Sequence, residues 1–345
     1  MAKSSTRKFR RVKKDIITEL PQNIQESILE LIAYKFVSVI NRILLLHNGK
    51  ILKFSLSYPD EDCNAEIIHD YVDQWIPFLA RKDLEVIDVD TSEQSIFDCP
   101  VLEKLTLVLC ESIFPNNFRA PKLRCLHQFS LRITKKYSLA GLENLTEYPF
   151  ALDGDGARVK LTKTCNVVEI LSRLPKIEKF CGAMDYMQFL AEGGSPNRLA
   201  KPLDYLKTLN ISGIYLTELS QVSCLLCVIQ SAPNLCTLNI SAEYIDEGDL
   251  ENYSIEGSED CAIDHLESVT FSNFKGMRAE LELVRFLLGR SPLLKTMSIH
   301  FGGAMEKDVA ATVAEEVFQY FTASSRVQIR YLERRVDFED FGAFC

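Results

Sequence analysis

A short unit with a fixed spacing of apolar residues recurs along the chain and limits the folds that are open to it. Residues 206–212 read LKTLNIS, and residues 235–241, 29 positions later, read LCTLNIS. Further units with the same spacing begin at Leu84, Leu102, Leu123, Leu142, Ile177, Leu266 and Leu294. The apolar residues alternate in the middle of each unit, which predicts a strand with one buried face.

The segments between the units indicate how these strands are connected. Four units follow a small residue and a proline, as in CPVLEKL, APKLRCL, APNLCTL and SPLLKTM, and proline ends a helix and turns the chain. The segment LTELSQVSCLLCVIQSAPN, between two of the units, has helical periodicity. Repeats of 18 to 35 residues with this signature are typical of leucine-rich repeats. The sequence therefore predicts an α/β solenoid, in which short parallel strands form a curved sheet and helices cover its outer side.

The strength of the repeat signal varies along the chain. It is strongest over residues 84–130 and 200–300, and it is weak over 131–175, where ALDGDGARVKL favours a hairpin or an irregular insert. Helical periodicity predicts connecting helices over residues 65–80, 167–174, 279–288 and 308–321. The last of these has an apolar stripe formed by Val309, Val313, Val317 and Phe321.

Apolar residues also repeat at helical spacing near the N-terminus. The pattern runs without a break from Pro21 through Ile24 and Ile43, and Asn48–Gly49 is a suitable helix stop. We therefore expect one long helix over residues 21 to about 47. Its C-terminal half should cap the first repeat, because the end of a solenoid needs a cover, and its N-terminal half should project or fold back.

The charge of the chain is unevenly distributed. The net charge is −9, but the first 14 residues carry +7, which leaves −16 on the remainder. An acidic body argues against nucleic acid as the main partner, since phosphate binding needs a basic face. The basic segment is either a solvated tail or a nuclear-import or weak phosphate-binding signal. No apolar run reaches the length of a membrane span and no signal peptide is evident, which predicts a nuclear or cytoplasmic protein with no membrane partner.

The residues that usually carry chemistry are scattered. The eleven cysteines are expected to be free thiols, and Cys224 and Cys227 lie in an apolar helical stretch that indicates core packing. The five histidines form no ligand-spaced cluster, and the GGSPN context of Ser195 lacks the pattern of a nucleophile elbow. No phosphate-binding or dinucleotide fingerprint occurs. We therefore predict no catalytic residue, no metal, no cofactor and no enzymatic activity.

Three segments, in their order along the chain, resemble a plant family. Residues 15–29, DIITELPQNIQESIL, resemble the start of an F-box. Residues 35–57, KFVSVINRILLLHNGKILKFSLS, resemble the segment that introduces the repeats in this family. Residues 265–300 resemble the FBD signature, with Phe274-Lys275-Gly276, Glu280-Leu281-Glu282 and the LL-x-x-SP-x-L run. The chain thus resembles plant F-box proteins with leucine-rich repeats and an FBD region.

The resemblance implies a division of the chain and a truncated F-box. The implied parts are a basic disordered tail over 1–14, a partial F-box over 15–34, leucine-rich repeats over 35–260, an FBD region over 261–335 and a tail over 336–345. A family F-box continues through a second Leu-Pro turn and further helices. Here Leu29 is followed by ELIAYKF, and the repeat-introducing segment begins at once.

The resemblance also implies a function, that of a substrate-recognition subunit of an SCF-type E3 ubiquitin ligase. Such a protein binds its target, here an unknown protein, through the repeats, and it binds a Skp-type adaptor, and hence the cullin ligase, through the F-box. The implied adaptor-binding residues are Leu20, Pro21, Ile24, Ile28 and Leu29. The alternative is a non-catalytic leucine-rich-repeat binding module that has lost adaptor binding because the F-box is truncated. For this alternative, exposed positions between the strand leucines would contribute to the binding face, such as Glu85, Lys104, Lys207 and Thr237.

Overall fold

One parallel sheet organises the protein. The computed structural model describes residues 37–46, 53–55, 75, 86–90, 100–108, 120–130, 142–152, 167–184, 186–191, 194–243, 255, 262–302 and 307–332. The strands are β1 (Lys53–Ser55), β2 (Val86–Asp90), β3 (Lys104–Val108), β4 (Cys125–Ser130), β5 (Glu147–Leu152), β6 (Lys179–Met184), β7 (Thr208–Tyr215), β8 (Thr237–Glu243), β9 (Ser268–Phe274), β10 (Thr296–Phe301) and β11 (Gln328–Leu332). These eleven strands form a single sheet in chain order.

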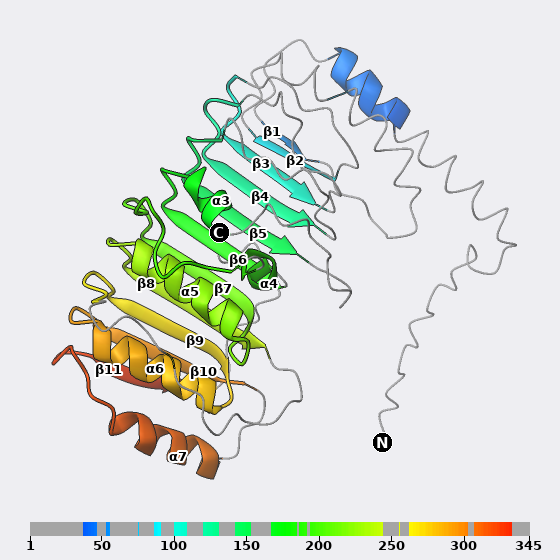
Figure 1. The fold of residues 1–345 in the computed structure, drawn as a ribbon. Helices are drawn as coiled ribbons and strands as arrows, with labels where there is room; N and C mark the ends of the chain where they lie inside the picture. The colour runs from blue at the N-terminus through cyan, green and yellow to red at the C-terminus, as the bar shows by residue number, and fades with distance from the viewer. Residues whose placement is uncertain are drawn as a thin grey trace, which may run out of the picture.

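Helices connect the later strands. They are α3 (Val167–Ser172), α4 (Tyr186–Ala191), α5 (Leu219–Ser231), α6 (Arg278–Arg290) and α7 (Lys307–Phe318). Figure 1 shows the strands stacked in a curved array, with α3, α5 and α6 against one face of it. The predicted leucine-rich-repeat solenoid is therefore confirmed. Within the part of the chain that the structure describes, no helix combines the length and the apolar character needed to cross a bilayer.

The strands share one register, which allows equivalent residues to be compared. Position 0 is the first residue of each strand from β3 onward, namely Lys104, Cys125, Glu147, Lys179, Thr208, Thr237, Ser268, Thr296 and Gln328. Two rows of apolar side chains, at positions −2 and +1, run through the core from β3 to β10 and are at most 1 % exposed. Burying each such side chain contributes about 1.5–3 kcal/mol. The leucines of the sequence pattern therefore form the core between the sheet and the helices.

A tight turn precedes each strand and explains the small residue and proline of the sequence pattern. The backbone N–H at position −2 donates to the carbonyl at position −5 in seven successive units, as from Leu123 to Ala120 and from Leu235 to Ala232. The prolines stand at position −4, the second residue of this turn, as in Pro121 and Pro233. The fixed φ of proline suits this place in a turn.

A second regularity joins neighbouring units at the edge where the strands begin. The carbonyl of Glu103, at position −1, accepts hydrogen bonds from the N–H groups of Arg124 and Cys125, at 2.9 and 3.1 Å. The same pair of bonds recurs in each unit up to Lys295 and Thr296, which donate to Glu267. The register is thereby fixed where each strand starts, whatever side chains the unit carries.

The weakly patterned region, residues 131–175, contains a regular strand. β5 pairs in parallel with β4 and β6, which confirms the strand expected from the unit that begins at Leu142. Of the stretch ALDGDGARVKL, only Ala151 and Leu152 are described, and they end β5; the hairpin or irregular insert expected over the rest of it lies outside the described residues. The core residues of β5 are aromatic, because Tyr148 and Phe150 occupy the positions of the usual aliphatic residues. Pro149 between them has no N–H to give to the sheet.

An aromatic cluster replaces aliphatic packing around β5 and β6. Phe150 stacks on Tyr186 of α4 with ring centroids 4.3 Å apart, and Tyr186 stacks on Phe189 at 5.5 Å. Gly182, at position +3 of β6, makes room for this cluster, since a Cβ there would lie 3.0 Å from the Tyr186 ring. The ring of α4 thus fills the space that a strand side chain fills in other units.

The FBD-like segment uses its signature residues to connect β9 to α6. Phe274 is fully buried, and Gly276 has φ +75°, where an added Cβ would lie 2.5 Å from Val313 of α7. Glu280 is 1 % exposed, and its carboxylate accepts the N–H groups of Met277 at 2.8 Å and Lys275 at 3.0 Å. This carboxylate satisfies N–H groups at the start of α6, which otherwise have no partner in the helix.

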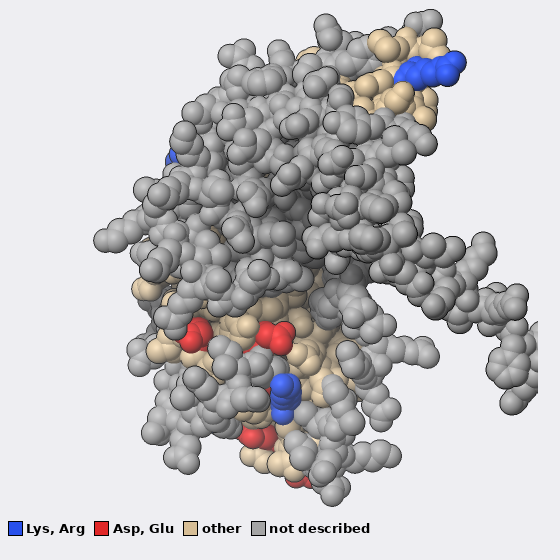
Figure 2. Space-filling view, turned by 90° about the vertical axis from the view of Figure 1, so that its right-hand side faces the viewer, with Lys and Arg blue, Asp and Glu red and all other residues tan. Residues whose placement is uncertain are grey.

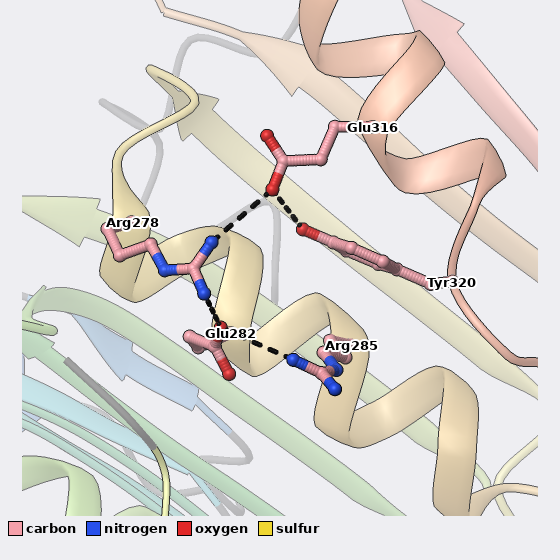
Figure 3. Close-up of polar contacts among 5 residues, drawn as sticks. All are labelled: Arg278, Glu282, Arg285, Glu316 and Tyr320. Carbon is pink, nitrogen blue, oxygen red and sulfur yellow. Dashed lines mark hydrogen bonds and ion pairs between the residues drawn. The ribbon is translucent and has the colours of Figure 1, made fainter. Parts of the chain in front are cut away.

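Polar contacts fasten α7 to α6. Figure 3 shows Arg278 between Glu282 of its own helix and Glu316 of α7, whose Oε1 lies 3.4 Å from the guanidinium and also accepts the Tyr320 hydroxyl at 2.8 Å. Of the predicted stripe on this helix, Val313 and Val317 are buried. Phe321 is not part of it, because α7 ends at Phe318 and the Phe321 side chain is 77 % exposed.

The predicted N-terminal helix is described over its last part only. Residues 37–46 are helical, and Val37 and Leu44 pack into the core. Asn41 of this helix accepts a hydrogen bond from the indole N–H of Trp75, which is buried. Of the other predicted helices, 167–174, 279–288 and 308–321 correspond to α3, α6 and α7, whereas 65–80 lies outside the described residues apart from Trp75.

Candidate protein-binding face

The side of the sheet opposite the helices, called here the open face, carries positions 0, +2 and +4 of each strand. Successive side chains of a strand point to opposite sides, so these positions face away from the core rows. From β7 to β10 they are Thr208, Asn210, Ser212, Thr237, Asn239, Ser241, Ser268, Thr270, Ser272, Thr296, Ser298 and His300. None is acidic, lysine or arginine, which leaves a continuous surface of hydroxyl and amide groups with one imidazole, that of His300.

A chain of hydrogen bonds orders the centre of this surface. Asn239 Nδ2 donates to Asn210 Oδ1 at 2.8 Å, and Asn210 Nδ2 donates to Cys181 Sγ at 3.4 Å. These three residues share position +2 on adjacent strands, so the contacts follow directly from the register. The amides are thereby held in fixed orientations, which is what selective hydrogen bonding to a partner requires.

Two buried polar atoms on this surface lack a partner. Ser272 Oγ and His300 Nδ1 form no hydrogen bond within the described residues, although Ser272 is only 5 % exposed. Burial lowers the pKa of His300, so the neutral imidazole is favoured. Both atoms have almost no exposed surface, so they do not themselves offer hydrogen bonds to a partner.

The open face from β3 to β6 has a different character. Position 0 carries Lys104, Glu147 and Lys179, and the thiol of Cys125 lies 3.8 Å from the Glu147 carboxylate. His127 at position +2 has its pKa lowered from 6.5 to about 4, chiefly by burial and further by Lys104 and Lys179. This half of the face is charged at its edge and holds a neutral histidine at its centre.

The arrangement offers little for covalent chemistry. Within the described residues no group of three or more His, Cys, Asp or Glu side chains could hold a metal ion. Burial raises the pKa of Cys224 to about 12 and also raises that of Cys227, which keeps both thiols protonated and unreactive. Both cysteines lie inside α5, as their apolar sequence context predicts.

A second exposed surface lies at the N-terminal end of the sheet. On helix 37–46, Val39, Ile43, Leu45 and Leu46 are 57 to 76 % exposed. Figure 2 shows this helix at the top of the molecule as a mostly tan surface. Four large apolar side chains in solvent on one short helix are unusual for a monomeric protein.

The sequence-predicted site residues are distributed as follows. The adaptor-binding residues Leu20, Pro21, Ile24, Ile28 and Leu29 lie outside the described residues. Glu85 also lies outside them. Lys104 and Thr237 stand on the open face at position 0.

Lys207 is the residue that the structure places elsewhere. It occupies position −1, at the edge where the strands begin, and forms an ion pair of 3.3 Å with Glu178. Sequence reasoning missed the amide and hydroxyl rows of the open face, although the Asn and Ser of the repeated TLNIS motif were the available signal.

Comparisons with known proteins bear on the identity of the chain. The FBD family model matches residues 260–299, which contain β9, α6 and the first part of β10. An F-box/FBD/LRR-repeat protein of Arabidopsis thaliana is 28 % identical over 353 residues, which covers 86 % of this chain and 83 % of the relative. The fold, the FBD match and this similarity together confirm the resemblance of the chain to plant F-box/FBD/LRR-repeat proteins.

Proposed function

We propose that this chain is a substrate-recognition subunit of an SCF-type E3 ubiquitin ligase. It binds a target protein through its repeats and a Skp-type adaptor through the F-box residues Leu20, Pro21, Ile24, Ile28 and Leu29. The F-box in the name of its Arabidopsis relative supports an adaptor-type role. In this role ubiquitin transfer takes place on other subunits, and the chain itself is not an enzyme.

The observation that carries target binding is the open face from β7 to β10, where positions 0, +2 and +4 carry no Lys, Arg, Asp or Glu. Its ordered amides, Asn210 and Asn239, and its hydroxyl groups are suited to hydrogen bonds with a protein partner. A surface without charged side chains avoids the desolvation cost of burying ions in an interface. It therefore favours recognition by shape and hydrogen bonding.

The apolar surface of helix 37–46 supports the proposed adaptor contact. Val39, Ile43 and Leu46 recur at spacings of four and three residues, as on one face of a helix. Continued at the same period toward the N-terminus, this stripe meets Ile32 and Ile28 of the sequence. In the proposal, the partial F-box over 15–34 and this helix present one apolar stripe.

Binding of the full chain to a purified plant Skp-type adaptor, measured by calorimetry, tests the ligase proposal. We expect micromolar or tighter binding that is lost in the double variant Ile24→Asp and Ile28→Asp. A matched double variant, Asn197→Asp and Gln319→Asp, places the same charges at exposed positions elsewhere and should bind normally. Failure of a well-folded chain to bind the adaptor would favour the alternative, a repeat-based binding module cut off from the ligase.

Cross-linking mass spectrometry of the chain expressed in plant cells tests target binding separately. The double variant Asn239→Arg and Thr270→Arg puts two charges on the open face, and it should lose cross-links that the parent forms. Arginine at Asn197 and Gln319 should keep them. If both variants retain every cross-link of the parent, the open face of β7–β10 does not bind the target.

A further inference from the structure

A groove runs along the edge where β3 to β6 begin, away from the open face. It has a volume of about 650 Å³, and its polar lining consists of Glu103, Lys122, Arg124, Asn144, Thr146 and Lys176. These residues come from the turns and position −1 of four successive units. Three of them are cations and one is a carboxylate, so the groove is basic in a chain whose net charge is −9.

The cations of this groove differ from others on the same edge of the sheet. Farther along, Lys207 pairs with Glu178 at 3.3 Å and Lys295 pairs with Glu267 at 2.7 Å. Within the described residues, Lys122 and Arg124 form no ion pair. Their positive charge is therefore available to a ligand.

The third cation is held toward the other two. Lys176 Nζ donates to Asn144 Oδ1 at 2.7 Å, and Asn144 Nδ2 donates to the carbonyl of Pro121 at 2.9 Å. The amide thus links the Lys176 ammonium to the turn that carries Lys122 and Arg124. Thr146 Oγ1 also donates to the Arg124 carbonyl, at 3.2 Å. These contacts arrange the groove before any ligand arrives, which lowers the entropic cost of binding.

We propose that this groove binds a phosphorylated segment of the target protein. This inference rests on the proposed function, which makes the ligand a target protein, and it names the chemical class of that ligand. Three cations and Glu103 give a lining of net charge +2, which matches the charge of about −2 on a phosphomonoester. The Arg124 guanidinium can donate two parallel hydrogen bonds to phosphate oxygens. Glu103 on one side disfavours a segment that is acidic throughout.

Fluorescence anisotropy with labelled peptides tests the proposal on the full chain without the adaptor. The probes are degenerate peptide pools with one fixed central residue, phosphoserine, glutamate or serine. We expect the phosphoserine pool to bind about tenfold or more tightly than the serine pool, with glutamate between them. Binding of the phosphoserine and serine pools with equal affinity would overturn the proposal.

Two double variants locate the binding. Lys122→Gln with Arg124→Gln should weaken phosphopeptide binding by about 30-fold or more. Lys295→Gln with Arg326→Gln removes the same charges farther along the edge and should leave it unchanged. The side chains of Lys122, Arg124 and Arg326 are exposed, so their replacement should not disturb the fold. Thermal unfolding verifies that each variant is folded. Equal weakening by the two pairs would show nonspecific attraction and overturn the site.

Competitors distinguish the source of the phosphate. Inorganic phosphate should displace the peptide only at far higher concentration, because it lacks the flanking backbone. Displacement at equal concentration, or tighter binding of a single-stranded RNA oligonucleotide, would overturn a target-protein ligand. Since no adaptor is present, loss of the ligase function would leave these measurements unaffected, and the two proposals can fail independently.

Discussion

The two halves of the described sheet share a backbone and differ in their side chains. From β3 to β6 the open face carries charges, thiols and a histidine, and the core at β5 and β6 is aromatic. From β7 to β10 the face carries hydroxyls and amides, and the core is mainly aliphatic. The register and the paired N–H bonds to position −1 continue through both halves.

This difference shows that the fold and the binding surface are specified by different positions. The rows at −2 and +1 hold the sheet together; row −2 is aliphatic from β3 to β10, whereas row +1 accepts either an aliphatic side chain or an aromatic ring. The rows at 0, +2 and +4 can change without disturbing the register. One molecule can therefore offer two surfaces with different chemistry, side by side.

The largest effect should come from the aromatic core of the first half. Phe150→Ala removes a fully buried ring that stacks on Tyr186, and it should lower the free energy of unfolding by about 3–5 kcal/mol. Leu238→Ala, in the second half, should cost about 2–5 kcal/mol. Urea unfolding followed by Trp75 fluorescence and by circular dichroism measures both. Separate transitions for the two probes would show that the halves unfold independently.

A smaller effect in the first half should depend on pH. The pKa of His127 is lowered to about 4 in the folded protein, so below pH 6.5 the unfolded chain binds a proton that the folded chain does not. Stability should therefore fall between pH 6.5 and 4, by about 1–2 kcal/mol after allowance for partial solvent exposure. The variant His127→Gln should lose this dependence.

Nuclear magnetic resonance titration of the same histidine gives a direct measurement. Lys104→Met removes a neighbouring cation, so the pKa of His127 should rise. The remote variant Lys295→Met is the control and should leave this pKa unchanged. A parent pKa near 6.5 would contradict the prediction.

Breaking the side-chain hydrogen bonds that join β6, β7 and β8 should lower the free energy of unfolding moderately. Asn210→Ala removes the donor to Cys181 Sγ on β6 and the acceptor of Asn239 on β8. We expect the free energy of unfolding to fall by about 1–2 kcal/mol, because Asn239 Nδ2 loses its hydrogen-bond acceptor. Thr296→Ala on the same face should change stability by no more than about 0.5 kcal/mol. Chemical denaturation compares the two, and equal losses would mean that the amide chain contributes nothing special.

The smallest effect should separate paired from unpaired cations on the edge of the sheet. Lys295→Met breaks the exposed ion pair with Glu267 and should cost at most about 0.5 kcal/mol. Lys122→Met removes a cation without a carboxylate partner and should leave stability unchanged. Thermal unfolding at low and high salt measures both. A clear loss of stability in Lys122→Met would mean that this lysine supports the fold.

The sequence predicted the solenoid because its leucines and turn prolines recur with a recognisable period. It also indicated β5 through the unit that begins at Leu142, although Tyr148 and Phe150 replace the usual aliphatic residues and Pro149 is unexpected in a strand. The reason for a glycine at position 182 is the Tyr186 ring of α4, which lies next to it in the fold. The spacing of residues in the sequence does not show this contact. The prediction for Phe321 failed because α7 ends before the stripe does.

The candidate sites were less predictable than the fold. Repeated TLNIS motifs place Asn210 and Asn239 on one row, but their contact requires the register of two strands. The groove joins Lys122, Arg124 and Lys176, which lie up to 54 positions apart in the sequence. Its charge depends on which cations are paired with carboxylates, and only coordinates reveal that.

The strictly sequential order of the strands has an evolutionary consequence. Each strand of the sheet pairs only with the strands that precede and follow it in the chain. Gain or loss of one whole unit during gene duplication would therefore lengthen or shorten the molecule by one strand spacing, about 4.8 Å, and leave every other pairing intact. Descendants of such a gene can acquire surfaces of new length and composition without inventing a new architecture.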